Sequence, residues 1–293
     1  MSKLHDLLTT NPVILADGAM GTQLFARGLE SGMSPELWNI EHPDRVMDVH
    51  RSYAEAGTQM LLTNSFGGTR FRLALHKFEG RVYEFNRAAA EITRNAVQDV
   101  PHIVLIGGSV GPSGELLEPL GTLTFDEAVD GFAEQATALR DGGVDYFQVE
   151  TMSALEEVEA AIKGIRRVSD LPIVATMSFD TNRRTMMGIK PEIAAHKLPE
   201  LGADVIGANC GTGVPDNLFV LEQMAKANPN AILFVKSNAG VPQYKGGELI
   251  YNGTPEVMAD YAVEARNLGA RIIGACCGSS PAHLAAMRER LGL

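Results

Sequence analysis

Three cysteines are the residues of this chain whose type and placement could do chemistry together. Cys276 and Cys277 are adjacent, and Cys210 is the only other cysteine among the 293 residues. Both sites follow a short apolar run and precede a glycine, which is typical of a strand that opens into a loop. Free cysteine also serves as a small apolar filler in strands, so residue type alone does not separate packing from metal binding. The shared setting of all three thiols favours one site for a soft metal ion.

The chemistry of such a site depends on where the last strand ends. Neighbouring residues in a regular strand point to opposite faces, so Cys276 and Cys277 can share one ion only if the strand ends before them. Three thiolates and one open position describe a catalytic zinc site, since structural sites close all four positions with protein ligands. Zinc with three thiolates has a net charge of about −1 by ligand counting, so it activates water poorly and suits a thiol substrate. Coordination would deprotonate a thiol whose unperturbed pKa is about 8.5.

The composition predicts one globular domain and argues against several kinds of partner. A chain of 293 residues with 45% hydrophobic residues can bury one large core. Its 25 basic and 36 acidic side chains give a net charge of −11, so we expect no nucleic acid and no anionic membrane as partner. Residues 1–11 do not resemble a signal peptide, and no apolar run is long enough for a membrane span. We expect a cytoplasmic protein with reduced thiols and no disulfide framework.

A repeated unit predicts the fold that positions the cysteines. Amphipathic stretches end in glycine and run directly into apolar segments. The eight predicted strands are residues 13–15, 60–63, 103–106, 146–150, 173–177, 205–209, 232–236 and 272–275. The predicted helices are residues 42–56, 70–97, 124–141, 154–168, 191–201, 215–227, 255–268 and 281–291. This α/β pattern predicts a single (β/α)8 TIM barrel over residues 1–293, with an open doubly wound sheet as the alternative.

In a barrel of this kind the active site lies at the C-terminal ends of the strands. Cys210 closes the sixth predicted strand and the cysteine pair follows the eighth, so the three thiols are neighbours across the seventh. A thiol substrate that is an amino acid would also need partners for its ammonium and carboxylate groups. Asp17 and Glu150 end strands and are candidates for the ammonium, although a lone acidic residue there more often caps a helix or forms an ion pair. The backbone of residues 18–21 could offer amides to the carboxylate.

Four blocks stand at the strand ends: Asp17-Gly18-Ala19-Met20-Gly21-Thr22, Thr63-Asn64-Ser65-Phe66-Gly67, Gly207-Ala208-Asn209-Cys210 and Gly274-Ala275-Cys276-Cys277-Gly278. Together they resemble the homocysteine S-methyltransferase family, which includes the homocysteine module of cobalamin-dependent methionine synthase, betaine-homocysteine methyltransferase and S-methylmethionine-dependent enzymes. The resemblance implies that three catalytic cysteines hold Zn2+, with homocysteine sulfur as the fourth ligand and methionine as the product; these are Cys210, Cys276 and Cys277. The predicted substrate-binding residues are Asp17, Gly18, Ala19, Ser109, Glu150 and Asn209.

Aromatic residues and two strand-end segments bear on the identity of the methyl donor. Betaine is best recognised by an aromatic cage, and Gly67 and Thr151 stand where animal betaine enzymes have tyrosines that resemble cage members. Phe66, Trp38 and Tyr244 are the aromatic residues from which another cage could be built. The segments that are more similar to the methionine synthase module are residues 178–188 and 236–242. We therefore expect the zinc-bound thiolate to attack a methyl group brought by a separate methylcorrinoid protein, with betaine or S-methylmethionine as alternative donors.

Two readings of other classes stay open from the sequence. Lys236, at the end of the seventh predicted strand, could form a Schiff base with a carbonyl substrate if its amine were desolvated. Alternatively, the zinc site could belong to a non-catalytic subunit of a methyl-transfer complex, in which case it would bind metal without binding homocysteine.

Overall fold

Eight strands form the centre of the molecule. The structure is a computed structural model that describes residues 2–241, 243–245 and 248–293. The strands of the central sheet are β1 (Ile14–Leu15), β2 (Met60–Leu62), β3 (Leu105–Val110), β4 (Tyr146–Met152), β5 (Ile173–Met177), β6 (Val205–Cys210), β7 (Leu233–Ser237) and β10 (Ala270–Ala275). All of them pair in parallel, in the order β1-β10-β7-β6-β5-β4-β3-β2.

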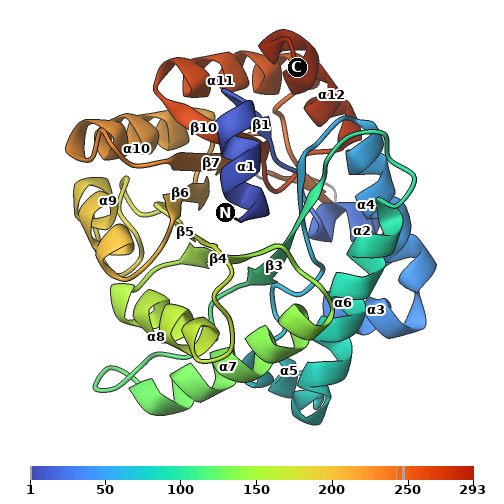
Figure 1. The fold of residues 1–293 in the computed structure, drawn as a ribbon, viewed down its shortest axis with the longest axis vertical. Coiled ribbons are helices and arrows are strands. Elements are labelled where there is room, and N and C mark those ends of the chain that lie inside the picture. Colours follow the sequence, from blue (N-terminus) through green and yellow to red (C-terminus); the bar gives the residue numbers. More distant parts are fainter. Residues whose placement is uncertain (1, 242, 246–247) are drawn as a thin grey trace.

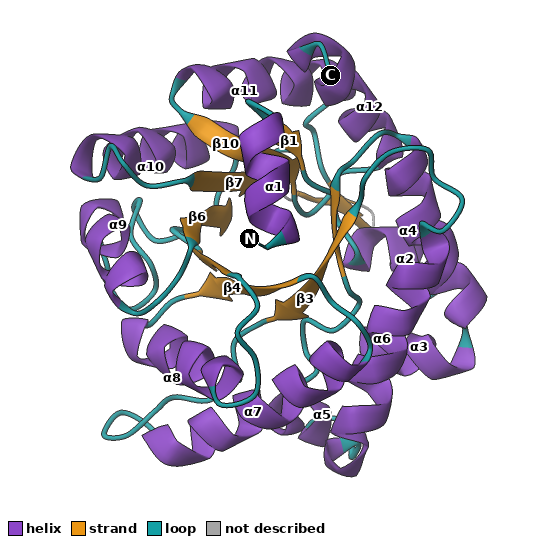
Figure 2. Cartoon of the chain, in the orientation of Figure 1, coloured by secondary structure: helices purple, strands orange, loops and turns teal. Residues whose placement is uncertain are grey.

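The two edges of this sheet meet, so that it forms a nearly closed barrel. A parallel bridge joins Ala16, just after β1, to Met60 at the start of β2. There the amide of Asp17 donates a hydrogen bond to the carbonyl oxygen of Met60 at 3.0 Å. Helices surround the barrel on the outside (Figure 1, Figure 2). The (β/α)8 TIM barrel predicted from the sequence is confirmed.

Helices connect successive strands, while α1 precedes β1 and α12 follows β10. They are α1 (Lys3–Thr10), α2 (Gly21–Ala26), η1 (Pro35–Leu37), α3 (Trp38–Glu41), α4 (Pro43–Glu55), α5 (Arg70–Ala74), η2 (Glu79–Arg81), α6 (Val82–Ala96), α7 (Phe125–Asp141), α8 (Leu155–Arg166), α9 (Pro191–Glu200), α10 (Val214–Ala227), α11 (Pro255–Asn267) and α12 (Pro281–Leu291). Between β7 and α11 the chain also forms an antiparallel pair, β8 (Gln243–Lys245) with β9 (Glu248–Ile250), which the sequence analysis did not predict. None of the helices in the described part of the chain is both long and apolar enough to span a membrane.

The predicted single helix over residues 70–97 is wrong, because the chain forms α5, η2 and α6 there. Lys77 has a φ of +62°, and the amide of Phe78 returns to the carbonyl oxygen of Leu73 at 3.0 Å. A left-handed residue with such a bond ends a helix. The break allows Leu73 and Phe85 to pack in one small cluster.

Four strands continue further at their C-terminal ends than predicted: β6 and β7 by one residue, β4 by two and β3 by four. β3 continues to Val110 and β4 to Met152, so Ser109 and Glu150 lie within strands. The sequence Gly107-Gly108 suggested a loop, but a Cβ atom at Gly107 would lie 2.3 Å from the Tyr146 ring. Glycine is needed in β3 because the tyrosine fills the barrel at that height.

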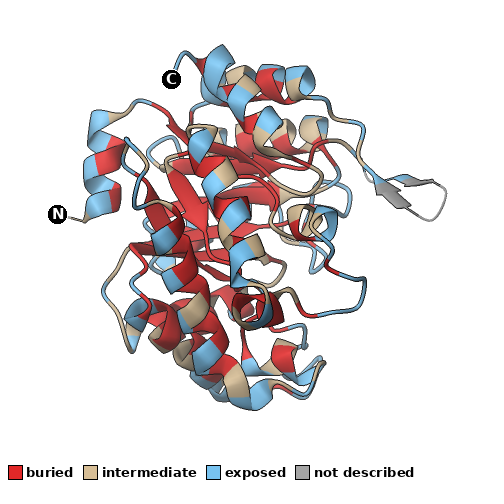
Figure 3. Cartoon of the chain, turned by 90° about the vertical axis from the view of Figure 1, so that its right-hand side faces the viewer, coloured by how far each residue is buried: buried red, intermediate tan, exposed pale blue. Residues whose placement is uncertain are grey.

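The barrel interior changes from apolar to polar along the strands. At the N-terminal end, one cluster contains Leu105, Tyr146 and Phe234 together with Leu4 and Leu7 of α1. Helix α1 therefore covers this end of the barrel, and Figure 3 shows its buried face turned toward the strands. Two and four residues further along β4, the same face carries Gln148 and Glu150.

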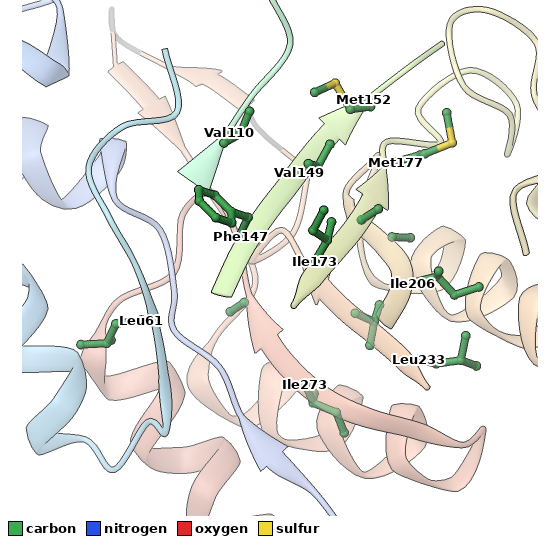
Figure 4. Close-up of a cluster of buried hydrophobic side chains, with 14 of the residues drawn as sticks. Leu61, Val110, Phe147, Val149, Met152, Ile173, Met177, Ile206, Leu233 and Ile273 are labelled. Atoms are coloured by element: carbon green, nitrogen blue, oxygen red, sulfur yellow. The ribbon is translucent and has the colours of Figure 1, made fainter. Parts of the chain in front are cut away.

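The opposite faces of the strands pack against the surrounding helices. Phe147, Ile173 and Ile206 belong to a large buried cluster that also includes side chains of the helices (Figure 4). The polar side chains of the interior therefore gather toward the C-terminal ends of the strands.

Candidate active site

The three thiols lie together at the C-terminal end of the barrel. Cys210 is the last residue of β6, and Cys276 and Cys277 follow β10 directly. Their sulfur atoms all lie within 4.8 Å of one another, and the Sγ atoms of Cys210 and Cys276 are 2.8 Å apart. Because β7 stands between β6 and β10, the prediction that the thiols are neighbours across the seventh barrel strand is confirmed.

Cys210 is held in an unusual backbone conformation. Its φ is +60°, a left-handed value that is uncommon for residues other than glycine. The side chain of Asn217 donates to the carbonyl oxygen of Cys210, and Asn238 donates to that of Gly211 at 2.8 Å. These two amides fix the turn that brings the Cys210 thiol toward the other two.

The cysteine pair is fixed by backbone bonds on both sides. β10 ends at Ala275, so the strand has ended before the pair, as the shared-ion hypothesis requires. The amide of Cys276 donates to the carbonyl oxygen of Ser237 at 2.7 Å, and that of Cys277 donates to Oδ1 of Asn238 at 3.1 Å. Both thiols can therefore face the same point although they are adjacent in the sequence.

This donor set fits a zinc ion. Three sulfur ligands are those that zinc prefers, and zinc–sulfur bonds of about 2.3 Å can reach thiols spaced in this way. Contacts with the thiols of Cys276 and Cys277, followed by burial, hold the pKa of Cys210 well above its usual value. Three thiolates this close repel one another, so a cation at their centre would favour the ionised forms. Among the described residues, no histidine, aspartate, glutamate or further cysteine joins the cluster as a fourth ligand.

Asp17 forms a buried ion pair beside the thiols. Its Oδ1 lies 2.6 Å from Nζ of Lys236, and its Oδ2 accepts a hydrogen bond from the amide of Leu62 at 2.8 Å. Burial raises the pKa of Asp17 above its usual value, and the Lys236 ammonium opposes this effect. Burial alone would lower the pKa of Lys236, but the carboxylates of Asp17 and Glu150 hold it above its usual value. The ion pair with Asp17 favours the ammonium form of Lys236, whereas Schiff-base formation needs a neutral amine.

Glu150 is the second buried carboxylate of the site. The hydroxyl of Ser109 donates to its Oε1 at 2.5 Å, which joins two of the predicted substrate-binding residues. Burial raises the pKa of Glu150 to about 7, while Lys236 and the bond from Ser109 act in the opposite direction. The carboxylate is thus poised between its charged and neutral forms near neutral pH.

The segment at Gly18 and Ala19 packs closely against the turn after the cysteines. The amide of Ala19 donates to the hydroxyl of Ser279 at 3.0 Å, and the hydroxyl of Tyr53 donates to the carbonyl oxygen of Ala19 at 2.8 Å. A Cβ atom at Gly18 would lie 2.6 Å from both hydroxyl oxygens. The amide of Ala19 is therefore engaged within the protein, and its predicted contact with a substrate carboxylate stays a prediction.

Asn209 links three strands below the thiols. Its Oδ1 accepts from the hydroxyl of Thr176 on β5 at 2.6 Å and from the amide of Thr151 on β4 at 2.9 Å. Its Nδ2 donates to the hydroxyl of Thr151 at 2.6 Å and approaches Sγ of Cys210 at 3.5 Å. Thr151, like Cys210, has a left-handed φ, of +61°. Asn209 thus holds the C-terminal ends of β4, β5 and β6 together beside the thiols. Its predicted substrate contact stays a prediction.

Sequence reasoning did not assign a role to several residues of this site. Lys236 was considered only as a Schiff-base lysine, and Asn217, Asn238 and Ser279 were not singled out. Tyr251 was also missed, although a Cβ atom at Gly278 would lie 2.1 Å from its Cγ atom. Asn238 follows the end of β7 and Ser279 follows Gly278, so their position beside strand ends could have identified them as site residues. No local pattern marked Tyr251.

The structure describes the side chains of two of the three aromatic residues proposed for a cage. Trp38 is buried, with 2% of its surface exposed, and packs against His42 and Arg45. Phe66 is 38% exposed at the barrel rim. The side chain of Tyr244 lies outside the described part of the chain.

Comparisons with known proteins agree with this class of molecule, a (β/α)8 barrel with a thiol site at its C-terminal end. The family model described as homocysteine S-methyltransferase matches residues 14–291. The methionine synthase of Mycobacterium tuberculosis is 32% identical over 303 residues, covering 96% of this chain and 25% of the relative. That of Mycobacterium leprae is 31% identical over 301 residues, covering 95% of this chain and 24% of the relative.

Solved structures of one homocysteine methyltransferase have a similar fold. The oxidized form of the homocysteine methyltransferase MmuM from Escherichia coli has a TM-score of 0.82 and 25% identity, covering 98% of this chain and 99% of that one. Its metallated form has a TM-score of 0.83 and 24% identity, with the same coverage. The chain belongs to the homocysteine S-methyltransferase family. It spans about a quarter of the length of the curated relatives that it matches.

Proposed function

We propose that this protein is a zinc-dependent homocysteine S-methyltransferase that makes methionine. The observation that carries the proposal is the cluster of three thiols within 4.8 Å of one another, beside buried polar groups at the open end of a barrel of this family. Cys210, Cys276 and Cys277 would hold the zinc ion. When bound, zinc would lower the pKa of a fourth, substrate thiol and so keep it as a nucleophilic thiolate at neutral pH.

The residues of this chain would bind and orient the substrate. Glu150 and Asp17 lie where the ammonium group of homocysteine is expected, and Ser109 fixes one oxygen of Glu150. In the reaction, the substrate thiol loses its proton to solvent, its sulfur forms a bond to the methyl carbon, and the bond between that carbon and the donor breaks. Positioning the sulfur and the methyl group in line would supply much of the rate enhancement.

We further propose that the methyl group comes from a methylcorrinoid protein. Several large apolar side chains are exposed on the loops that follow β2, β3 and β5, at the same end of the barrel as the thiols; they are Phe66, Leu116, Leu120, Met186 and Met187. An apolar rim suits a macromolecular donor better than a small quaternary ammonium compound. The burial of Trp38 and the absence of a tyrosine at position 151 weigh against a betaine cage.

Methionine formation by the zinc-loaded protein tests this proposal. Homocysteine would be supplied with methylcobalamin, betaine or S-methylmethionine as the only donor. Turnover with methylcobalamin is expected, and turnover with betaine or S-methylmethionine alone would overturn the donor assignment. A protein that binds zinc but shows no heat of homocysteine binding would instead be a non-catalytic subunit.

A cellular location in a reducing compartment fits this function. The three free thiols must stay reduced in order to hold a metal ion. We therefore retain the expected cytoplasmic location as part of the proposal.

A further inference from the structure

The side-chain amide of Asn209 uses all of its hydrogen-bonding capacity inside the protein. An amide has two acceptor sites on its oxygen and two N–H donors. Oδ1 of Asn209 accepts from the hydroxyl of Thr176 and from the backbone amide of Thr151. Nδ2 donates to the hydroxyl of Thr151 and to Sγ of Cys210. Asn209 is 1% exposed, so a substrate could bind its amide only by displacing one of these four bonds.

The orientation of this amide follows from its neighbours. The backbone nitrogen of Thr151 can only donate, so the atom of Asn209 that lies 2.9 Å from it is the oxygen. The hydroxyl of Thr176 donates to the same oxygen at 2.6 Å. Nδ2 is therefore directed toward Sγ of Cys210, at a distance of 3.5 Å.

Cys210 is the thiol whose direction depends most on such a contact. Its backbone is left-handed, and Asn217 and Asn238 donate to the carbonyl oxygens of Cys210 and Gly211. Those two bonds fix the turn but do not act on the sulfur. Within the described residues, no side-chain amide other than that of Asn209 donates to a cysteine sulfur.

An N–H group beside a metal-bound thiolate withdraws part of the negative charge of the sulfur and fixes its direction. Hydrogen bonds of this kind orient metal ligands and tune the metal. Three thiolates around zinc give a net charge of about −1, so a donor to one of them reduces their mutual repulsion. Because Thr151 lies on β4 and Thr176 on β5, the strands beside Cys210 hold this donor in place.

We propose that Asn209 is a positioning residue of the metal site. Its amide, oriented by Thr151 and Thr176, directs Sγ of Cys210 toward the shared metal position and hydrogen-bonds that sulfur when the metal is bound. This inference rests on the proposed function, because it concerns how the same site holds its metal. It replaces the substrate contact expected for Asn209 from the sequence.

Cobalt(II) in place of zinc makes the contact measurable, because thiolate-to-cobalt charge-transfer absorption depends on the electron density of the sulfur. Asn209→Asp keeps the oxygen that accepts from Thr151 and Thr176 but has no N–H donor, whereas Asn209→Ala removes the whole amide. Both variants should shift the charge-transfer band to longer wavelength, since a sulfur without its hydrogen bond gives up an electron more readily. The variants differ in charge, so a shift that they share belongs to the lost N–H group.

Thr176→Val tests the orientation of the amide and keeps both its N–H donors. This nearly isosteric variant removes one of the two bonds to Oδ1 of Asn209. It should shift the band in the same direction as Asn209→Asp but by a smaller amount. It also keeps the test decisive if Asn209→Ala does not fold.

Zinc affinity, measured by competition with a chromophoric chelator, is the second readout. Asn209→Ala should bind zinc about tenfold to a hundredfold more weakly. Asn228→Asp is the matched control, because Nδ2 of Asn228 donates to the carbonyl oxygen of Ala195 at 2.9 Å, between α10 and β7 at the other end of the barrel. This control should change neither the band nor the zinc affinity.

An unshifted band in the Asn209 variants would overturn the inference even if zinc affinity falls, since Asn209 would then only tie the strands together. Opposite shifts in Asn209→Asp and Asn209→Ala would also overturn it, because the change would follow the charge and not the lost donor.

Failure of the proposed function would look different. A cobalt-loaded wild-type protein that has thiolate charge-transfer bands, in a chain whose zinc form makes no methionine, would contradict the function and leave the inference standing if the bands shift as expected. A wild-type protein without such bands would overturn both. Thermal unfolding of each metal-free variant shows whether a lost band reflects loss of the site or of the fold.

Discussion

Among single residues, Cys210 is the one on which the proposed metal site depends most directly, because it alone comes from β6. Cys210→Ala should lose zinc and methyl transfer together, since two remaining thiolates hold the ion poorly. Metal content after gel filtration and methionine formation would both be measured. Ser169→Ala, a substitution in the loop at the other end of β5, is the matched control. A Cys210→Ala protein with full zinc content and turnover would remove the zinc hypothesis.

Glu150 should make stability depend on pH in a defined window. Its pKa is about 7 in the folded metal-free protein against 4.5 as the reference, so the folded state holds the proton more tightly than the unfolded chain. The stabilisation is fully present below about pH 4.5 and is lost as pH rises to about 7, by about 3 kcal/mol in total. The charged or titratable groups facing Glu150 are Lys236, Asp17 and Cys276.

Urea unfolding of the metal-free protein and of Glu150→Gln at several pH values checks this dependence. The difference in unfolding free energy between wild type and variant should fall between pH 4.5 and 7 and stay level above pH 7. A difference that does not change with pH would show that the carboxylate is not buried as described. Glu157→Gln is a useful comparison, because that carboxylate is also buried but lies against Ser113.

At the scale of elements, the turn after β10 determines whether the adjacent cysteines can act together. Gly278 has a φ of +82°, and a Cβ atom there would lie 2.1 Å from Cγ of Tyr251. Gly278→Ala must therefore adopt a left-handed conformation and displace an aromatic ring that packs beside the thiols. We expect it to lower both zinc affinity and the melting temperature.

Gly292→Ala is the control for this prediction. Gly292 has a similar φ, +74°, but nothing lies within 4 Å of a Cβ atom at that position. Both variants carry a left-handed cost of about 1 kcal/mol, so the excess loss in Gly278→Ala measures the contact with Tyr251. Equal melting temperatures and equal zinc affinities in the two variants would mean that the ring can move aside freely.

In the barrel as a whole, the apolar cluster that stabilises the fold and the proposed site lie at opposite ends. Helix α1 closes the N-terminal end with Leu4, Leu7 and Leu8, far along the strands from the thiols. Leu7→Ala should lower the unfolding free energy by about 3 kcal/mol, because it leaves a cavity in this cluster. The homocysteine dissociation constant should stay within twofold of wild type (roughly 0.4 kcal/mol).

Chemical denaturation and calorimetry on the same protein test this separation. Thr9→Ala, an exposed substitution on α1, should change neither quantity by a measurable amount. A large loss of homocysteine affinity in Leu7→Ala, with zinc still bound, would show that the two ends of the barrel are coupled.

The sequence by itself determined the architecture and the grouping of the three thiols. Apolar periodicity reports strands and helices because it follows from backbone geometry, and parallel strands of a barrel present their C-terminal ends at one rim. Cys210, Cys276 and Cys277 could therefore be brought together by counting strands. The family resemblance, confirmed by the match over residues 14–291, added the proposed substrate.

Only the tertiary structure decided which groups of the site are free to bind a ligand. Asp17 and Lys236 are 219 residues apart in the sequence, and nothing local marks them as partners. The break near Lys77 and the closure of the barrel by α1 likewise depend on contacts between distant segments. Residue types and spacing locate polar groups along the chain, but the hydrogen bonds that pair Asp17 with Lys236 and saturate the amide of Asn209 form only when the strands pack side by side.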